Sequence, residues 1–521
     1  ASRYDDGRWE LVLRRPLRPS DPQAPAAKCG PARCCGDRRL IASTVIAPFG
    51  FPLPMRLLHT SDWHLGHTLH DLGREQEHAA FLNFLLEVIR EHRVDALLIA
   101  GDIFESANPP ASAQATWYGF LATAHARFPG LDIVVIGGNH DSAARLDAPK
   151  PLLDGLASPV RGSGRVHVVG GLPRKEDGHL DLARLIVPLR AGDSEQAAAW
   201  VAAVPYLRPA DLPRIEEDTP RFVEDPLIDG VWRTYDEVLR AARKRRQPGQ
   251  ALLAMGHCYM SGSAVSELSE RKILGGNQHA LPAELFPSDV AYVALGHLHL
   301  AQEVGRLNVR YSGSPIPLSL KERSYAHQVV LVDLDGEQFV RARSIDVPRR
   351  VEILRVPEHG AETLAYVLQE LALLEDDDDL PDAAPMQKPA QQAILPLPGP
   401  VTLDFEEPRE SAALGPPPGT RGAPLDRPIL EVQVLLMEPD PTLRRTIEAA
   451  LEGKKARLVK LGVQYVDVER EAPSLPPDRH LRELSPEEVF ARCFAATYDA
   501  DPSDALLEAF HDLVDAVHQG Q

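Results

Sequence analysis

The 521-residue sequence has only five cysteines, fewer basic than acidic residues and no long apolar run. The cysteines are too few and too scattered for a disulfide framework, which favours a reducing, cytoplasmic environment. Because no run of about 18 apolar residues occurs, we expect no membrane span. The net charge of −19, from 56 basic and 75 acidic residues, argues against a nucleic-acid partner unless bound cations or a partner subunit supply positive charge.

The length predicts two or three domains, because one hydrophobic core rarely grows beyond about 250–300 residues. Hydrophobic residues make up 44% and charged residues 25% of the chain, as in soluble globular proteins. Residues 1–54 are rich in arginine and proline, show no sustained periodicity and lack the apolar core of a signal peptide. We expect them to be a disordered or non-native leader, and we expect the first strand to start at Met55.

Three apolar runs in the first third of the chain end in side chains that commonly bind metals. The central run, Ala96 to Ala100, lies between Asp95 and Gly101 and predicts a strand buried on both faces of a parallel sheet. Asp102 follows this strand, and open α/β sheets bind ligands at the carboxyl ends of their strands. The two flanking runs end similarly. Residues 57–61 are followed by Asp62 and His64, and residues 133–136 are followed by Asn139, His140 and Asp141.

Amphipathic segments connect these runs. Residues 77–92 carry apolar side chains at i, i+3 and i+4 spacing, which predicts a helix, and a second helix is expected at residues 111–128. The order β-α-β-α-β indicates an α/β fold with right-handed connections, in which helices lie outside a layered β-sheet. We expect strands at residues 309–311 and 329–332 to complete this sheet.

Two later apolar runs also end in glycine followed by histidine. They span residues 252–255 and 290–295, and they add His257, His297 and His299 to the candidate ligands. A single histidine after a strand is usually a polar cap, but five such strand ends together indicate a metal site. Oxygen ligands mixed with imidazoles suit Mn²⁺, Fe²⁺ or Zn²⁺ better than Ca²⁺ or Mg²⁺. Two ions about 3.5–4 Å apart serve in-line displacement at phosphorus, with Asp102 as the candidate bridging ligand.

The composition changes sharply after the predicted sheet. Residues 375–428 begin with an acidic run and continue as proline-rich sequence, so we expect a disordered insertion there. A strand at 429–436, a helix at 441–451 and an extended segment at 456–468 follow. With the residues before the insertion, they predict a small α+β domain at 349–475.

Two short helices are predicted in the tail, residues 480–521. Ser485 to Glu488 form a capping box with proline at the first helical position. Both helices have an apolar face, one around Phe490 and one around Phe510. From this pattern alone, the helices either dock on a partner or pack on their own domain.

The five strand ends resemble the motifs of the calcineurin-like metallophosphoesterases. These motifs are Asp62-Trp63-His64, Gly101-Asp102, Gly138-Asn139-His140-Asp141, Gly256-His257 and Gly296-His297-Leu298-His299. The flanking blocks, residues 58–66 and 313–319, are similar to those of the SbcD nuclease subunits of bacterial SbcCD complexes. The resemblance runs from residue 55 to 348, which would be the nuclease domain, resumes more weakly in the small domain and returns at 484–490.

The resemblance implies a role for each motif residue. One manganese ion would be held by Asp62, His64, Asp102 and His299, and the other by Asp102, Asn139, His257 and His297. His140 would contact the scissile phosphate and assist the leaving oxygen. Asp141 would orient the His140 ring through a hydrogen bond, with a helix or turn cap as its plainer interpretation.

Several nearby residues have plainer interpretations. The ligand roles of the first motif are already filled, which argues against further ligands among His59, His67, His70 and His78. Cys258 follows His257, but strand alternation turns its side chain to the other face, so burial is favoured over metal binding. The turn at residues 313–315 either presents backbone N–H groups to a phosphate or is only a tight turn.

For the whole chain, the resemblance implies a Mn²⁺-dependent DNA nuclease of repair, recombination and replication. It would act on double-stranded ends as an exonuclease and on single strands and hairpins as an endonuclease. Its partner would be an SbcC-type coiled-coil ATPase docked on the tail, in a heterotetramer of two subunits of each kind. Two alternatives are a stand-alone phosphoesterase acting on small-molecule or protein phosphoesters, which the same site would permit, and an inactive scaffold that binds DNA ends. The complete motif set disfavours the scaffold.

Overall fold

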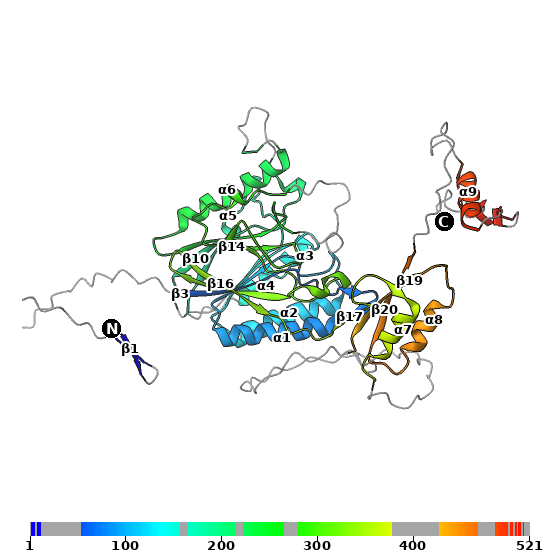
Figure 1. Ribbon diagram of the computed structural model, residues 1–521. Coiled ribbons are helices and arrows are strands. Elements are labelled where there is room, and N and C mark those ends of the chain that lie inside the picture. The colour runs from blue at the N-terminus through cyan, green and yellow to red at the C-terminus, as the bar shows by residue number, and fades with distance from the viewer. Residues whose placement is uncertain are drawn as a thin grey trace, which may run out of the picture. The chain divides into compact units, whose positions relative to one another are not determined.

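The computed structural model divides the chain into two units, residues 1–50 and 51–521 (Figure 1). The described residues are 2–5, 8–11, 54–156, 165–192, 194–213, 222–223, 225–264, 280–377, 427–466, 485–498, 501–503, 506–507, 509–511 and 514. In the first unit, β1 (Ser2–Asp5) and β2 (Arg8–Leu11) form an antiparallel hairpin, which the sequence analysis did not predict in the expected leader. The remainder of that leader, up to residue 53, lies outside the described residues.

The first large sheet of the second unit has the strand order β16-β15-β3-β6-β7-β8. Four neighbours, β3, β6, β7 and β8, run parallel to one another. At one edge, β15 pairs antiparallel with β3, and β16 pairs antiparallel with β15. The strand predicted at Ala96 to Ala100 is confirmed to the residue. The bounds are β3 Pro54–Thr60, β6 Ala96–Ala100, β7 Asp132–Ile136, β8 Val166–Val169, β15 Gln328–Asp335 and β16 Gln338–Asp346.

A second six-stranded sheet has the order β13-β14-β12-β11-β10-β9. We expected the strand at 309–311 to complete the first sheet, and this was wrong, because it pairs with β12 in the second sheet. Both sheets contain strands that are apolar on both faces, so the sequence pattern could not separate them. The bounds are β9 Ile186–Arg190, β10 Ala197–Ala203, β11 Ala251–His257, β12 Tyr292–Gly296, β13 Gln302–Val304 and β14 Arg306–Tyr311.

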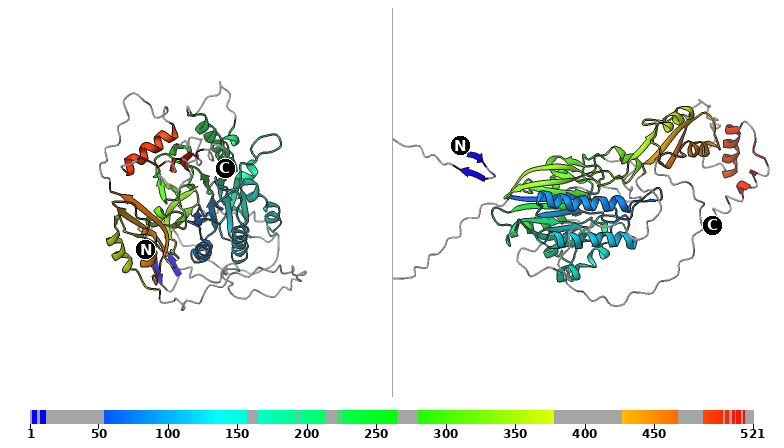
Figure 2. Two further views of the ribbon diagram at one scale, coloured as in Figure 1. Left: turned by 90° about the vertical axis from the view of Figure 1, so that its right-hand side faces the viewer. Right: turned by 90° about the horizontal axis from the view of Figure 1, so that it is seen from below.

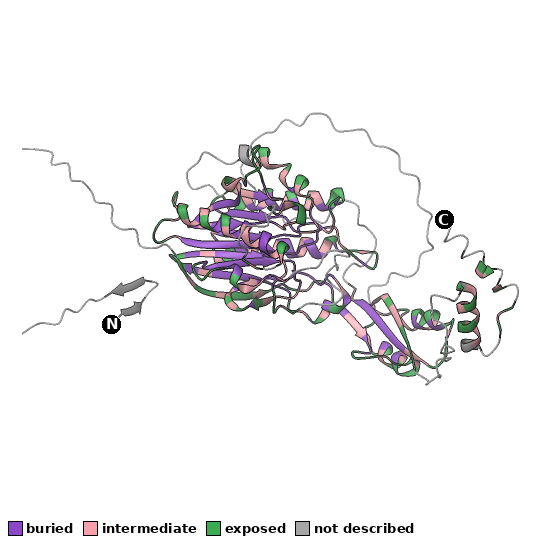
Figure 3. Ribbon diagram, turned by 90° about the horizontal axis from the view of Figure 1, so that it is seen from above, coloured by how far each residue is buried: buried purple, intermediate pink, exposed green. Residues whose placement is uncertain are grey.

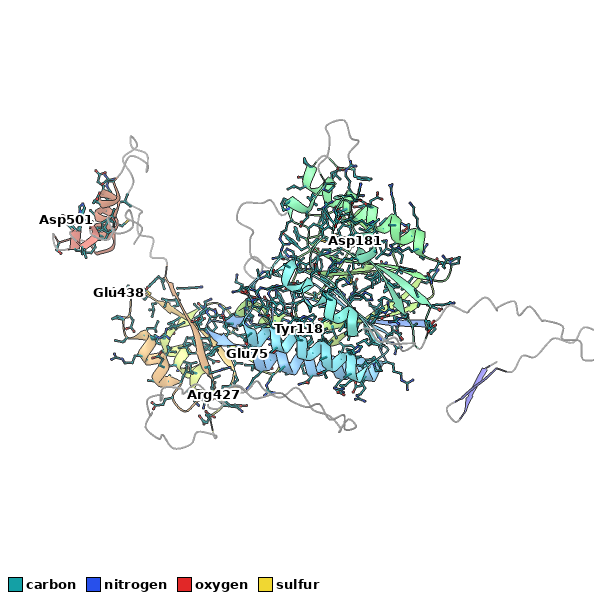
Figure 4. All side chains as sticks on the ribbon, turned by 180° about the vertical axis from the view of Figure 1, so that it is seen from behind. Glu75, Tyr118, Asp181, Arg427, Glu438 and Asp501 are labelled. Atoms are coloured by element: carbon teal, nitrogen blue, oxygen red, sulfur yellow. The ribbon has the colours of Figure 1, made fainter. Side chains whose placement is uncertain are left out.

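Side chains of β6 alternate between two hydrophobic cores. Leu98 and Ala100 belong to a core shared with the second sheet, and Leu97 and Ile99 to a core shared with α1 (Glu75–His92) and α2 (Ala111–Arg127). Helix α6 (Pro226–Arg245) contributes to the first of these cores. The two sheets lie between α1 and α2 on one side and α6 on the other (Figures 1 and 2). Their central strands are buried (Figure 3), and Figure 4 shows the side chains that fill this layered domain. The predicted helices at 77–92 and 111–128 are thus confirmed.

Short elements connect the layers. They are β4 Thr68–Leu69, β5 Leu72–Gly73, α3 Ala143–Asp147, α4 Lys150–Leu156, α5 Leu182–Leu185, and 3₁₀ turns at Pro209–Asp211, Ala283–Leu285 and Leu320–Ser324. Over the described ranges, no helix combines the length and apolar character needed to cross a membrane.

A smaller four-stranded sheet follows residue 350 and has its own core. Its centre is β19 (Ile429–Leu436), the strand predicted there, which pairs in parallel with β17, β18 and β20. The predicted helix is present as α8 (Leu443–Ala450). The other elements are β17 Ile353–Val356, β18 Glu362–Thr363, α7 Leu364–Ala372 and β20 Arg457–Tyr465. Most of the predicted insertion, residues 378–426, lies outside the described residues.

The predicted capping box begins helix α9 (Pro486–Tyr498). Ser485 Oγ accepts from the Glu488 N–H at 3.2 Å, and a Glu488 carboxylate oxygen accepts from the Ser485 N–H at 3.1 Å. A second helical turn begins near Ser503, and its Phe510 ring stacks on Phe490 with 4.2 Å between centroids. The two apolar faces of the tail therefore contact each other through these rings.

The core between the two large sheets should dominate stability. Leu98 is fully buried there, so we expect Leu98→Ala to lower the free energy of unfolding by about 3 kcal/mol. Urea unfolding, followed by the fluorescence of the buried Trp63 and Trp117, measures the loss. The matched control is Leu307→Ala, because this β14 side chain is 66% exposed and its truncation should cost little. Equal losses in the two variants would contradict this packing.

Stability should also depend on pH through His78, whose Nε2 lies 2.9 Å from the Trp63 carbonyl oxygen. Burial, assisted by the nearby Arg74, lowers the pKa of His78 from 6.5 to about 3. Between these values the unfolded chain binds a proton that the folded chain does not, so stability falls as the pH falls. For metal-free protein we expect this histidine to contribute a loss of about 2 kcal/mol between about pH 7.5 and about pH 5. Urea unfolding at both pH values should show a smaller loss for His78→Gln than for the wild type.

Candidate metal centre

The candidate ligands lie at the carboxyl ends of the parallel strands, several of them on residues with left-handed backbone angles. Asp62, His64, Asp102 and His297 have φ values of 54°, 49°, 50° and 104°. Such angles are unfavourable for residues other than glycine and persist only where the surroundings hold them. Here the Asp62 N–H donates to the Gly101 carbonyl at 3.0 Å, and the His64 N–H to the Asp102 carbonyl at 3.1 Å. The loops after β3 and β6 are thereby fixed to each other.

Two motif glycines allow the ligand loops to approach closely. Gly101 has a φ of +92°, and a Cβ atom there would clash with Nδ1 of His257. A Cβ atom on Gly138 would clash with the Asp102 carboxylate. The glycines in these motifs are therefore required by the space available around the ligands.

Asp62, His64 and His299 form one group of possible metal ligands. Their ligand atoms lie within 4.8 Å of one another, and all three residues are buried. Nε2 of His64 is buried and has no hydrogen-bond partner among the residues that the structure describes. An unpartnered buried nitrogen is costly in the protein alone but suits a coordinated cation, so this donor set fits a metal ion.

Asn139, His257 and His297 form the second group. Oδ1 of Asn139 lies 3.0 Å from Nε2 of His257 and 2.9 Å from Nδ1 of His297. Asp102 lies between the groups, with Oδ2 3.2 Å from Nε2 of His257 and 3.7 Å from Nε2 of His64. The structure thus brings together all seven predicted ligands, with Asp102 where a bridging carboxylate would be needed.

The electrostatics of the centre are dominated by Asp102 and the imidazoles around it. Burial alone would raise the pKa of Asp102, but His257, followed by His64 and His140, holds that pKa below its ordinary value. Although burial opposes its charge, His257 has its pKa raised to about 9, chiefly by Asp102. Burial and the neighbouring His257 lower the pKa of His297 to about 3. A buried carboxylate that attracts positive charge this strongly is suited to binding cations.

Two glutamates that the sequence analysis did not assign hold the rings of two candidate ligands. Glu105 Oε2 lies 2.9 Å from Nδ1 of His64, and Glu322 Oε1 lies 3.1 Å from Nδ1 of His299. The Ala100 carbonyl plays the same part for Nδ1 of His257, at 2.8 Å. Such acceptors fix the tautomer and orientation of a metal-binding imidazole and leave Nε2 for the ion. Glu105 is three residues beyond Asp102, but no local pattern distinguishes Glu322.

The structure corrects the expected partner of Asp141. Its carboxylate accepts from the backbone N–H groups of Ile103, Phe104 and Gly138, at 3.1, 3.0 and 2.9 Å. It therefore ties the β6 loop to the β7 loop, which matches the plainer interpretation as a cap. Burial, followed by the nearby Asp102, raises the pKa of Asp141 to about 6.

His140 is oriented by a different residue. Nδ1 of its ring lies 2.7 Å from the Glu105 carbonyl oxygen. Its backbone N–H donates to Oδ1 of Asp102 at 2.9 Å. The ring lies against that of His64, with 4.7 Å between centroids. Glu105 thus contacts a metal-ligand candidate through its side chain and His140 through its backbone.

Other histidines near the first motif have structural partners. His59 contacts the Tyr292 hydroxyl at 2.9 Å and the Leu295 carbonyl at 3.1 Å, and His78 contacts the Trp63 carbonyl. The plainer interpretation of both is therefore confirmed.

The turn at residues 313–315 also has a structural part. The Ser314 N–H donates to the His299 carbonyl at 3.0 Å, and Gly313 adopts a φ of +77°. The Ser314 N–H therefore supports the loop that carries His299. This observation favours the tight-turn interpretation for Ser314.

Comparison with known proteins finds relatives along most of the chain. Residues 55–301 match the family described as calcineurin-like phosphoesterase, and residues 408–498 match the type 5 capsule protein repressor C-terminal domain. The SbcD subunit of the nuclease SbcCD from Rhodobacter capsulatus is 36% identical over 441 residues, 84% of this chain and 94% of that protein. Its counterparts in Escherichia coli K12 and Bacillus subtilis are 35% and 37% identical over 56% and 54% of this chain, and 68% and 66% of their own length.

The supporting glutamates give a test of the centre. Glu322 is fully buried. We expect Glu322→Gln to weaken Mn²⁺ binding by at least about tenfold, because a neutral amide holds the His299 ring less firmly than the charged carboxylate does. Calorimetric titration of metal-free protein with Mn²⁺ measures the affinity. Glu303→Gln is the matched control, since Glu303 pairs with Arg310 at the surface. Unchanged affinity in Glu322→Gln would refute the supporting role.

Proposed function

This chain belongs to the SbcD family of nuclease subunits, and we propose that it hydrolyses phosphodiester bonds of DNA with two Mn²⁺ ions. Membership makes it a metal-dependent phosphodiesterase with a dinuclear metal site. The proposal assigns it double-strand exonuclease and single-strand or hairpin endonuclease activity, in the cytoplasm. One observation carries it: ligand-type side chains from five strand ends converge around the buried carboxylate of Asp102.

Each side chain receives a defined role in this proposal. One ion would be held by Asp62, His64, Asp102 and His299, and the other by Asp102, Asn139, His257 and His297. When bound, the ions supply a water acidified to near-neutral pKa and neutralise charge on the phosphate oxygens. The acceptors on Nδ1 of His64, His257 and His299 keep the opposite nitrogens available for the ions.

His140 is proposed to contact the scissile phosphate and assist the leaving oxygen. Because its Nδ1 is engaged by the Glu105 carbonyl, Nε2 is the nitrogen left for a substrate oxygen. Asp141 is proposed as a positioning residue, because it ties together the loops that carry Asp102 and His140. These contacts support an acid–base role for His140 beside the proposed metal ligands.

The partner assignment rests on family membership and on the tail. The relatives are named as subunits of SbcCD, so we propose an SbcC-type coiled-coil ATPase as partner, in a heterotetramer of two subunits of each kind. Helix α9 and the turn after it would form the docking segment, because they carry half-exposed apolar side chains. The small domain at 349–475 would cap the path of the DNA. A basic partner surface would also offset the net charge of −19.

Two variants test the nuclease function. With the ATPase subunit and Mn²⁺ present, we expect His140→Gln to slow degradation of linear duplex DNA by at least about 100-fold while keeping its metal, since only the acid–base group is lost. Asp102→Ala should lose both activity and metal, measured by elemental analysis. His179→Gln, at an exposed position, is the matched control. Hydrolysis of a small phosphoester without any cleavage of DNA would reject this function in favour of a stand-alone phosphoesterase.

A further inference from the structure

One loop at the metal centre carries none of the predicted ligands. It follows β10, which ends at Ala203 and lies parallel to β11, so its carboxyl end lies at the same sheet edge as His257. The Tyr206 N–H donates to the Gly137 carbonyl at 2.9 Å, which joins this loop to the β7 loop of the other sheet. Residues 204–208 therefore bridge the two sheets beside the candidate ligands.

The Tyr206 ring lies next to two of the candidate ligands. Its centroid lies 6.5 Å from that of His297, with 29° between the ring planes, and 6.2 Å from that of His257. The side chain is half-buried, so one part packs on the ligands while another part remains accessible. The ring is thus placed against two of the ligands proposed for the second ion.

Arg208 lies against this ring and beside the His140 loop. Its guanidinium carbon is 5.8 Å from the Tyr206 centroid, and its Nη2 donates to the Asp141 carbonyl at 3.2 Å. The side chain is half-buried, and among the described residues no carboxylate pairs with its guanidinium. By contrast, Arg190 of β9 is paired with Asp132 at 2.6 Å. Arg208 therefore keeps a positive charge and several N–H donors at the rim of an acidic, imidazole-rich site.

We propose that Arg208, held in place by Tyr206, binds a DNA backbone phosphate next to the scissile one. This inference rests on the proposed function, since it names a contact to the DNA substrate of that same site. A planar guanidinium with free donors is well suited to phosphate oxygens, and a cation–π contact limits its motion before DNA binds. The two ions would neutralise the scissile phosphate itself, so the additional cation serves a neighbouring phosphate that a short substrate lacks.

Arg208→Gln gives the first test, with the full chain bound to its ATPase subunit. We expect the KM for linear duplex DNA to rise roughly tenfold with a smaller change in kcat, because a charged hydrogen bond to the substrate is lost. The slope of the logarithm of DNA affinity against the logarithm of salt concentration should become shallower by the amount that about one phosphate contact contributes. Hydrolysis of bis(p-nitrophenyl) phosphate, which has one phosphate, should be affected less than hydrolysis of DNA.

Further variants separate this contact from a structural role. Arg208→Lys keeps the charge and should restore the salt dependence, but only part of the affinity, because it loses the planar fork. Tyr206→Phe keeps the ring and should recover most of the DNA affinity lost in Tyr206→Leu. The matched control is Arg90→Gln: Arg90 lies in the last turn of α1, just before β6 begins, and therefore at the opposite sheet edge.

Two outcomes would overturn the inference. If the wild type degrades DNA and Arg208→Gln has the same KM and salt dependence, the phosphate contact is refuted while the nuclease function stands. If the wild type hydrolyses the small diester but neither binds nor cleaves DNA, both the function and the contact fail.

Discussion

The site depends on one constraint, the burial of the Asp102 carboxylate among imidazoles where two sheets meet. Asp102 contacts His257 of the second sheet at 3.2 Å and also lies near His64 of the first. A buried charge of this kind requires compensation, and the protein supplies it through the imidazoles of His257, His64 and His140 and through the His140 backbone N–H, which donates to the carboxylate. Bound cations would satisfy the same requirement, which fits the concentration of carboxylates and imidazoles at this sheet edge.

Much of the centre could be predicted because its ligands follow strands that the sequence marks clearly. The run from Ala96 to Ala100 is apolar throughout and stops at Gly101, so both the strand and the place of Asp102 were evident. The supporting residues were not evident, because their roles depend on contacts across long sequence distances. Glu322 contacts His299 from a 3₁₀ turn, and Arg208 reaches Asp141 from a loop without ligand-type residues.

The division into two sheets was missed for a related reason. An apolar run indicates a buried strand but not which partner it pairs with, and β12 and β6 have the same pattern. The predicted hydrogen bond between Asp141 and the His140 ring was also wrong, because it was inferred from the adjacency of the two residues in sequence. In the structure the Asp141 carboxylate accepts from three backbone N–H groups, and the Glu105 carbonyl oxygen contacts the His140 ring instead.

The proposed ligands are distributed over a long stretch of the chain, which bears on when the site can be complete during synthesis. The first sheet supplies Asp62 to Asn139, whereas His257, His297 and His299 come from a segment more than a hundred residues later. The last histidine is oriented by Glu322, further still along the chain. A polypeptide that has not been translated as far as His257 would therefore lack three of the seven proposed ligands. The proposed site would therefore become complete only after both sheets have been translated and have packed together.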